Sequence, residues 1–458
     1  MDDNRLWAVQ LAAATRLSDS RHNTRLGIIL ETFANQPTDS IPQASDNWGQ
    51  TKAVYRFLDN PQVAPEVLDE GAARRTAQLC RQSPVVLAVQ DTTSINLSAN
   101  DSIAELGPID SKNLAHGLLL HTTLAVTEQG SLVGILGQQF WARARPGQPG
   151  PKPEKAAEDR ESTKWINGID QARQALHEGG EPGPRIIHVM DREGDVYDVM
   201  QWIDDQGDSA VIRSVQNRLV EGPLRLAHDT VRDQAVLERK RIEVPRSHGC
   251  ATRKALVELR TVTTTLVPNL HKNPHGWPMA WTLVEVWEPD PPERQQPLHW
   301  LLWTREPALT AVEAWEVVRK YTYRWRIEEF HLTLKSGCRI EELQLETWPR
   351  LLKALMLYSV VAARIVSLRD LSRTEPDAPA TVLLSEDECK VLWARCGKGK
   401  PELGSVLTLR QAVLWIGRLG GHLNRKADGM PGVRTLWRGM QDLGLLVKGY
   451  QAAKRELE

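Results

Sequence analysis

Two short apolar runs constrain the fold of this chain more than any other feature. They read VVLAV at residues 85–89 and RIIHVM at residues 185–190. Runs of this length, rich in Val and Ile, are typical of strands buried on both faces, as in a parallel sheet covered by helices. Asp91 follows the first run after one glutamine, and Asp191 follows the second directly. The sequence therefore predicts an α/β core with an aspartate at the end of each of two strands.

These two aspartates are candidate metal ligands. In open α/β sheets, ligands bind at the carboxyl ends of the strands. A pair of carboxylates at that edge suits Mg²⁺, which takes oxygen ligands from a few carboxylates and from substrate phosphates. Taken singly, either Asp91 or Asp191 is more often explained as a residue that starts a turn or caps a helix. A third acidic group is needed to strengthen the metal interpretation.

A long helix is predicted from about Ala311 to Lys335. Thr310 and Glu313 form a capping-box signature at its start. Gly337 is a natural stop just after its end. The pattern favours a single helix.

Four polar residues of this helix share one stripe: Tyr321, Arg324, Glu328 and Lys335. At about 100° per residue, all four lie within an arc of about 60°. A stripe facing the core would be apolar. Two cations beside one carboxylate suit a site where a metal lies between Glu328 and DNA phosphates held by Arg324 and Lys335. The alternative is an ordinary solvated face, with Arg324 and Glu328 paired at i,i+4.

The charge distribution leaves DNA binding open. The net charge is −1, which is unusual for a nucleic-acid enzyme. Phosphate contacts are local, however, and residues 319–339 hold six basic side chains against two acidic ones. Residues 213–260 hold eleven against six. On charge alone, the same segments are explained equally well as solvated faces of a globular protein.

Three stretches then connect the chain to a known group: AVQDTTSINL (88–97), VMDREGD (189–195) and YTYRWRIEEFHLTLKSG (321–337). The chain resembles the cut-and-paste transposases of the insertion-sequence-four group, and most closely the transposon-five type. The last stretch contains the group's Tyr-x2-Arg-x3-Glu-x6-Lys signature without a gap. Weaker similarity reaches VYRFLDNP (54–61) and IGRLGGHLNRK (416–426), so the resemblance spans nearly the whole chain.

The resemblance implies a ribonuclease-H-like catalytic core in which Asp91, Asp191 and Glu328 bind two Mg²⁺ ions, with Mn²⁺ able to substitute. The two metals of such a site clamp the attacking and leaving oxygens of an in-line displacement. The implied activity is excision of an element through a DNA hairpin, followed by strand transfer into target DNA. The signature spacing selects Glu328, and not the adjacent Glu329, as the third ligand.

The resemblance also implies contacts with a flipped nucleotide near the hairpin. Trp300 matches a tryptophan that stacks on the flipped base, a contact worth about 1–3 kcal/mol. Its alternative role is that of a core residue in a strand. Arg213 matches a basic residue beside the hairpin, whereas Leu332 replaces an expected lysine. Tyr321, Arg324 and Lys335 would hold phosphates around the nucleotide.

Other DNA contacts are expected from the first seventy residues, which look helical. Arg21 and Arg25, one turn apart, could lie along one phosphate backbone. A short amphipathic helix over residues 50–58 presents further polar groups on one side. The complete set of expected DNA-contacting residues is Arg21, Arg25, Lys52, Tyr55, Arg56, Arg213, Trp300, Tyr321, Arg324, Trp325, Arg326 and Lys335.

Three domains are expected. Residues 1–70 form a helical domain that binds transposon ends, and residues 71–374 form the catalytic domain, with a β-rich insertion at about 216–298. Residues 375–458 form a helical dimerisation domain. The expected partners are double-stranded DNA, both ends and target, and a second copy of the chain in a synaptic complex.

Cellular location and rival functions follow from the remaining features. The longest apolar stretch, residues 354–366, is broken by Arg364 and is too short for a membrane span of about 20 residues. We therefore expect no membrane partner and a bacterial, nucleoid-associated, cytoplasmic location. The five cysteines form no zinc-binding pattern. The rivals are a ribonuclease-H-like nuclease or recombinase that does not transpose, and a non-catalytic DNA-binding repressor.

Overall fold

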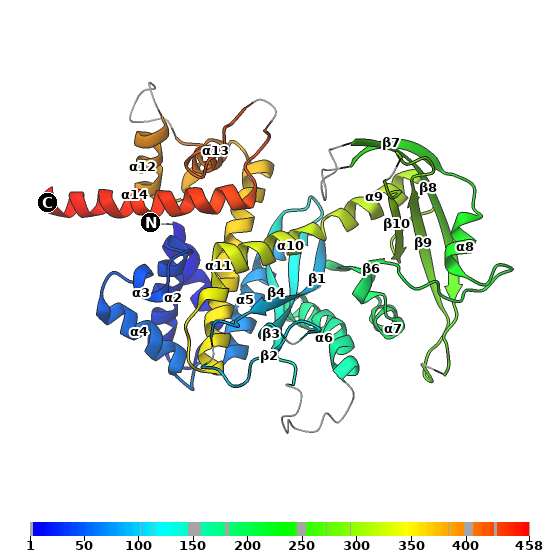
Figure 1. The fold of residues 1–458 in the computed structure, drawn as a ribbon, viewed down its shortest axis with the longest axis horizontal. Coiled ribbons are helices and arrows are strands. Elements are labelled where there is room, and N and C mark those ends of the chain that lie inside the picture. Colours follow the sequence, from blue (N-terminus) through cyan, green and yellow to red (C-terminus); the bar gives the residue numbers. More distant parts are fainter. Residues whose placement is uncertain are drawn as a thin grey trace. The chain divides into compact units, whose positions relative to one another are not determined.

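The computed structural model describes residues 3–457, apart from residues 101, 113, 145–156, 179–182, 245–252, 272, 294, 383, 398–405 and 426–427. The chain divides into two compact units. The terminal unit comprises Met1–Gln82, Thr92–Lys152 and Arg326–Glu458. The internal unit comprises Ser83–Asp91 and Pro153–Trp325. Figure 1 labels the elements of both units, and helices make up the two ends of the chain.

The terminal unit begins with five helices, as the sequence predicts. Asn47 caps the helix that carries the expected DNA-contacting residues, because its side chain accepts a hydrogen bond from the Gln50 backbone N–H. That helix ends at Asp59, two residues before Pro61. The five helices are α1 (Asp3–Thr15), α2 (Ser20–Asn35), α3 (Ile41–Ala44), α4 (Trp48–Asp59) and α5 (Pro65–Cys80).

A hairpin and a long helix form the middle of the terminal unit. Strands β3 (His116–Thr127) and β4 (Leu132–Trp141) are antiparallel, and Gly130 takes a φ of 85° in the turn between them. Short strand β2 (Gly107–Pro108) pairs with β3. Helix α11 (Trp348–Thr374), yellow in Figure 1, packs on β4 beside α5.

Helix α11 is apolar enough, by length and composition, to cross a membrane. Its most apolar window is nevertheless 72% buried inside the protein. Such burial is typical of the core helix of a globular protein, in which a helix that is apolar all round is covered by its neighbours.

The C-terminal part is helical, as predicted. Ser385 with Glu388, and Thr408 with Gln411, form capping boxes at the starts of two helices. Buried apolar residues of the C-terminal helices, including Leu392 of α12 and Leu443 of α14, make a small core. The elements are η4 (Ala380–Val382), α12 (Glu386–Cys396), α13 (Leu409–Leu419) and α14 (Val433–Leu457).

The internal unit is built on a mixed sheet. The first part of β1 (Val85–Asn96) is parallel to β5 (Arg185–Met190), which is parallel to β6 (Ser209–Arg213). The sheet continues through antiparallel pairs. The strands that continue it are, in order, β10 (His299–Thr304), β9 (Met279–Trp287), β8 (Arg253–Leu266) and β7 (Glu238–Val244). The β-rich residues between β6 and β10 thus extend the same sheet.

Helices and large aromatic side chains cover this sheet. Trp165, Trp281 and Trp303 are each almost fully buried in one apolar cluster. A tryptophan buries far more apolar surface than an aliphatic residue, so three of them supply much of the core. The helices of the unit are α6 (Ala157–His177), η1 (Arg192–Gly194), α7 (Tyr197–Asp205), α8 (Ala227–Arg232) and α9 (Ala311–Thr322).

The end of the first predicted strand is wrong. The sequence pattern ends it at Asp91, but β1 continues to Asn96. The β-branched residues Thr92, Thr93 and Ile95 favour the extended backbone and carry the strand onward. Asp91 therefore lies inside a long strand, at the point where the chain passes from the internal to the terminal unit.

The prediction of a single long helix is also wrong. Helix α9 ends at Thr322, and α10 (Trp325–Leu332) begins after a turn at Tyr323 and Arg324. The turn carries i→i−3 bonds, from Tyr323 N to Lys320 O and from Arg324 N to Tyr321 O. The aromatic and β-branched residues of this stretch are weak helix formers.

A second irregularity follows α10. Residues Thr333–Gly337 form a π-helical turn, η2, which ends at the predicted glycine; a short 3₁₀ turn, η3 (Ile340–Glu342), comes next. Each irregular turn changes the rotation per residue. The stripe calculated for one regular helix therefore does not hold from Tyr321 to Lys335.

Candidate active site

Asp91 and Asp191 are brought together by the register of β1 and β5. The last pair of the parallel ladder is Val89 with Val189. Asp191 keeps an extended backbone, with φ −83° and ψ −163°. Continuing the register by two residues places Asp91 beside Asp191, and neighbouring strands lie about 4.8 Å apart. The continued register thus aligns Asp91 and Asp191, 100 positions apart in the sequence, on two neighbouring strands.

Each of these carboxylates has a protein partner. Arg324 Nη1 donates to Asp91 Oδ2 over 3.2 Å, and both side chains are largely buried. Asp191 Oδ1 accepts from Glu193 N over 2.8 Å and caps the short helix η1. The capping role foreseen as the alternative for Asp191 is therefore present, and it uses one oxygen of the carboxylate.

The donor chemistry of this pair fits Mg²⁺. Both groups offer hard carboxylate oxygens, and Arg324 supplies a positive charge that compensates Asp91. Within the part of the chain that the structure describes, three or more His, Cys, Asp or Glu residues do not gather into a metal-binding group. Asp91 and Asp191 belong to the internal unit, and Glu328 belongs to the terminal unit.

Trp300 lies beside Tyr321 in the internal unit. Their rings meet edge to face, with centroids 6.4 Å apart. Trp300 is half-buried on β10, whereas the following residues Leu302 and Trp303 are fully buried. The indole of Trp300 is thus partly exposed, unlike that of a core tryptophan. Tyr321 is only 7% exposed, so little of its ring is open to solvent.

Arg213 is the last residue of β6. Its Nη2 donates to the carbonyl oxygen of His299 over 2.9 Å, on the neighbouring strand β10. The imidazole of His299 in turn contacts the buried carboxylate of Glu285, with Nε2 and Oε1 3.0 Å apart. Arg213 is half-buried and next to the strand that carries Trp300.

Glu328 and Lys335 lie in the terminal unit. Glu328 is half-buried on α10, and Lys335 is half-buried on η2. Lys335 Nζ donates to Thr93 Oγ1 over 3.2 Å and to Ser94 O over 2.8 Å. Lys335 thus binds the second part of β1, a few residues beyond Asp91.

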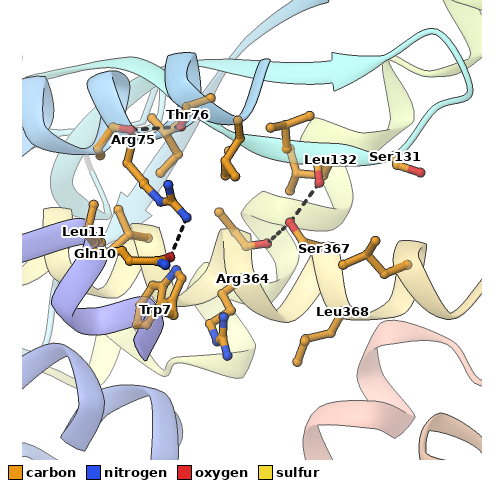
Figure 2. A pocket seen from close by; sticks show the side chains of 18 of the residues that line it. Trp7, Gln10, Leu11, Arg75, Thr76, Ser131, Leu132, Arg364, Ser367 and Leu368 are labelled. Carbon is orange, nitrogen blue, oxygen red and sulfur yellow. Dashed lines mark hydrogen bonds between the residues drawn. The ribbon is translucent and has the colours of Figure 1, made fainter. Parts of the chain in front are cut away.

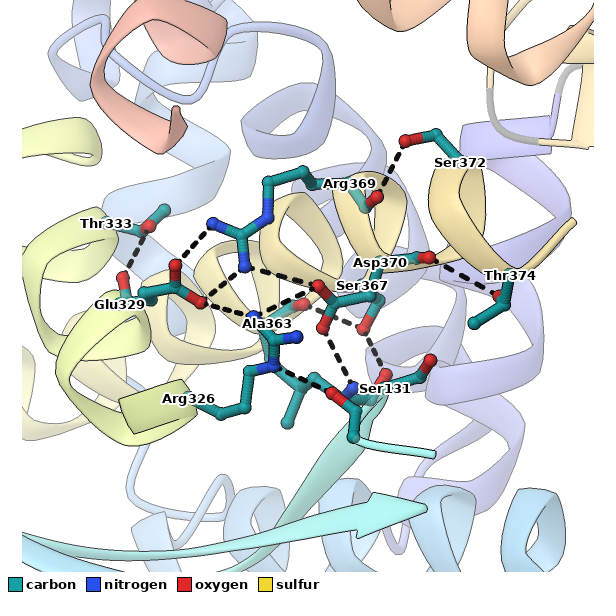
Figure 3. Close-up of polar contacts among 12 residues, drawn as sticks. Ser131, Arg326, Glu329, Thr333, Ala363, Ser367, Arg369, Asp370, Ser372 and Thr374 are labelled. Carbon is teal, nitrogen blue, oxygen red and sulfur yellow. Dashed lines mark hydrogen bonds and ion pairs between the residues drawn. The ribbon is translucent and has the colours of Figure 1, made fainter. Parts of the chain in front are cut away.

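Trp325 and Arg326, neighbours in sequence, have different surroundings. Trp325 is 59% exposed. Arg326 Nε donates to Gly130 O over 2.7 Å, and its Nη1 donates to Glu329 Oε2 over 2.8 Å (Figure 3). These bonds tie its guanidinium to the protein, and the DNA contact expected from sequence stays a prediction.

The expected DNA contacts of α4 are accessible to different degrees. Lys52 and Arg56 are exposed, and Lys52 Nζ lies 5.4 Å from the ring centroid of Trp48. Tyr55 is half-buried, and burial raises the pKa of its hydroxyl. Trp48 itself is 66% exposed and was not expected to contact DNA. Its position next to the predicted amphipathic helix, which carries Lys52 and Arg56, was the signal that could have made it a candidate DNA contact.

The two arginines of α2 also differ. The Arg21 side chain is exposed but pairs with Asp19, its Nη2 lying 2.7 Å from Oδ2. The bonds from Arg21 lower the pKa of the Asp19 carboxyl to about 2. Arg25 is half-buried.

Lys164 is a cation that the sequence interpretation missed. It is buried on α6, and its Nζ donates to Glu193 Oε2 over 3.2 Å. Glu193 also donates its backbone N–H to Asp191, so Lys164 reaches the segment that follows the second aspartate. The stretch ESTKW (161–165), which is weakly similar to the transposase group named above, was the signal that could have identified it.

A cavity of about 420 Å³ lies elsewhere, within the terminal unit. Figure 2 shows Arg75 bound to Gln10 on one side and Ser367 bound to Leu132 on the other. Most of its lining is apolar, and its lining residues include no carboxylate. This cavity therefore lacks the groups that metal-dependent chemistry on DNA requires.

Three family models match the chain in order. A model described as transposase DNA-binding matches residues 4–63. A transposase DDE domain matches residues 166–363, a range that contains Asp191 and Glu328 but not Asp91. A transposase Tn5 dimerisation domain matches residues 360–458, so it begins inside α11, earlier than the expected boundary at residue 375.

Proposed function

We propose that this chain, a DNA-binding DDE transposase by its three matched domains, excises an element through a hairpin intermediate and inserts it into target DNA by strand transfer. The proposal is supported by the parallel register of β1 and β5, which aligns Asp91 with Asp191 when it is continued by two residues. Asp191 and Glu328 lie within the matched DDE segment. The signature spacing in sequence supplies the assignment of Glu328.

Asp91, Asp191 and Glu328 are the proposed catalytic carboxylates, on a ribonuclease-H-like core. Together they would hold two Mg²⁺ ions, or Mn²⁺ in their place. Metals held in this way activate the attacking oxygen and stabilise the leaving oxygen of a phosphoryl transfer. The protein's own contribution is to fix the three carboxylates and to orient the scissile phosphate.

Arg324 has two proposed states. Without DNA it pairs with Asp91 over 3.2 Å. A DNA phosphate is a competing anion, and a guanidinium binds phosphate oxygens well. Arg324 would then move to the phosphate and release an oxygen of Asp91 to bind the metal. Lys335 and Tyr321 would hold the neighbouring phosphates.

Trp300 and Arg213 would serve the flipped nucleotide. The partly exposed indole of Trp300 offers a stacking surface, and Arg213 holds the strand beside it. Residues 1–70 would bind the transposon ends. Residues 375–458 would hold two copies together in the synaptic complex, where each subunit cuts mainly the end bound by its partner. This activity belongs in the bacterial cytoplasm, at the nucleoid.

Replacing each carboxylate in turn tests the proposal. Asp91→Ala, Asp191→Ala and Glu328→Ala should each reduce cleavage of DNA that carries the flanking inverted repeats by several orders of magnitude. Specific end binding should persist, because that contact belongs to another domain. Gel assays of nicking, hairpin formation and strand transfer, with and without Mg²⁺, provide the measurement.

Asp205→Ala is the matched control, because Asp205 is an exposed acid on α7 of the same unit. Its cleavage rate should equal that of the parent protein. Near-normal cutting by Asp191→Ala would end the metal assignment. Cutting by the parent without strand transfer would instead indicate a nuclease.

A further inference from the structure

Four charged side chains gather in the terminal unit, next in sequence to the proposed ligand Glu328 (Figure 3). Arg326 and Glu329 come from α10, and Arg369 and Asp370 come from α11. We call this group the α10–α11 cluster. It joins the matched DDE segment to the matched dimerisation segment.

The centre of the cluster is a two-pronged bond between Arg369 and Glu329. Arg369 Nη1 donates to Oε1 over 2.6 Å, and Nη2 donates to Oε2. Arg369 is only 2% exposed. Such bidentate pairs fix direction as well as distance. Burial alone would raise the pKa of Glu329, but the bonds from Arg369 and Arg326 outweigh it and lower that pKa.

The cluster is anchored on three sides. Asp370 Oδ2 accepts from Leu132 N over 3.1 Å, at the start of β4. Arg326 donates to Gly130 O in the turn before that strand. Thr333, the first residue of η2, donates its hydroxyl to the Glu329 carbonyl over 2.8 Å. Helix α10 is therefore tied to a hairpin, to α11 and to its own π-helical turn.

Fixing Glu329 also fixes the direction of Glu328. Consecutive residues of an α-helix point about 100° apart, so rotating α10 would move both carboxylates together. We propose that the α10–α11 cluster holds Glu328 in its metal-binding orientation, with Arg369 and Glu329 as positioning residues. This rests on the proposed function, in which Glu328 is a metal ligand.

A merely structural role would give a different result from a positioning role. Removing one partner of a buried ion pair costs stability, whereas replacing both partners often costs little, so the double variant separates loss of folding from loss of positioning. Residues that orient a metal ligand change the affinity for the metal, typically by about 10–100-fold. The dependence of cleavage on Mg²⁺ concentration therefore separates the two roles.

The test uses Arg369→Met, which keeps the apolar stem and removes the charge. The half-saturating Mg²⁺ concentration for cleavage of a transposon-end substrate should rise about tenfold. The rate at saturating Mg²⁺ should fall much less. Arg369→Lys, which retains the charge but not the two-pronged bond, should recover part of the affinity. Combining Arg369→Met with Glu329→Gln should be no worse than the more severe single change.

Arg350→Gln is the matched control. Arg350 makes a similar pair with Asp59 in the first turn of the same helix, and breaking it should leave the Mg²⁺ dependence unchanged. Thermal melting and end binding are measured for every variant. An unchanged half-saturating Mg²⁺ concentration in folded Arg369→Met overturns the proposal. Full cleavage by Glu328→Ala would overturn the proposed function instead, whatever Arg369→Met does.

Discussion

Single carboxylates in this protein differ mainly in what surrounds them. Asp91 and Glu329 each face an arginine, whereas Asp69 is sealed between α5 and β4 with one backbone bond, from Gln138 N. Asp69 Oδ1 is buried and has no hydrogen-bond partner. Burial raises the pKa of Asp69 to about 7. Burial thus raises the pKa of one carboxyl, Asp69, whereas the bonds from two arginines outweigh burial and lower that of another, Glu329.

Asp69 should make stability fall as the pH rises. Its folded pKa of about 7 lies above the usual 3.8, so the folded state binds the proton more tightly. The stabilisation is complete below about pH 4 and is lost as pH rises through 7, at up to about 1.4 kcal/mol per pH unit. Asp69→Asn should flatten the pH dependence between pH 5 and 8 in urea unfolding. Equal slopes for the two proteins would contradict the assignment.

At the scale of elements, the position of α9 depends on a buried glutamate. Glu306, just after β10, accepts from Arg185 of β5 over 2.5 Å and from Lys320 of α9 over 2.5 Å. Burial would raise the pKa of Glu306, but these bonds outweigh it and lower the pKa to about 2. One carboxylate therefore holds a helix against two strands of the internal sheet.

Breaking this contact should be costly near neutral pH. Glu306→Gln should destabilise the protein by about 3 kcal/mol, because two cations lose a buried partner. The folded pKa lies below the unfolded one, so the contribution is present above about pH 4.5 and disappears as pH falls towards 2. Urea unfolding of both proteins at pH 7 and pH 3 measures the difference. Glu313→Gln, at the exposed start of α9, is the control and should lose much less.

At the scale of the whole molecule, the near-zero net charge does not prevent DNA binding. The total of −1 averages over acidic and basic segments, and only the charges near the phosphates count. Lys52 and Arg56 are exposed on α4, within the matched DNA-binding segment. Affinity for transposon ends should therefore fall steeply with salt.

The salt dependence can be assigned to single residues. Lys52→Gln should weaken end binding and reduce the slope of log K against log salt by about 0.9, the value for one phosphate contact. Fluorescence anisotropy at several salt concentrations gives the slope. Lys390→Gln, an exposed lysine paired with Glu386 on α12, should leave it unchanged. If both variants showed the same slope, Lys52 would not be a phosphate contact.

The sequence predicted those parts of the fold that depend on local patterns. The bounds of β5 and the capping box at Thr310 were both predicted correctly. The break at Tyr323 was missed because the polar and apolar spacing continues across it. The bond between Glu329 and Arg369 was missed because the two residues are 40 positions apart, and no local pattern pairs them.

The division of the chain has a consequence for biosynthesis. The internal unit is made from two stretches that are both complete once Trp325 has been translated. The terminal unit needs its last stretch, from Arg326, which supplies α10 and α11. The core of the terminal unit therefore cannot be completed until translation has passed that stretch. A truncated product that stops before α11 would thus keep every residue of the internal sheet but lack the helix on which β4 packs.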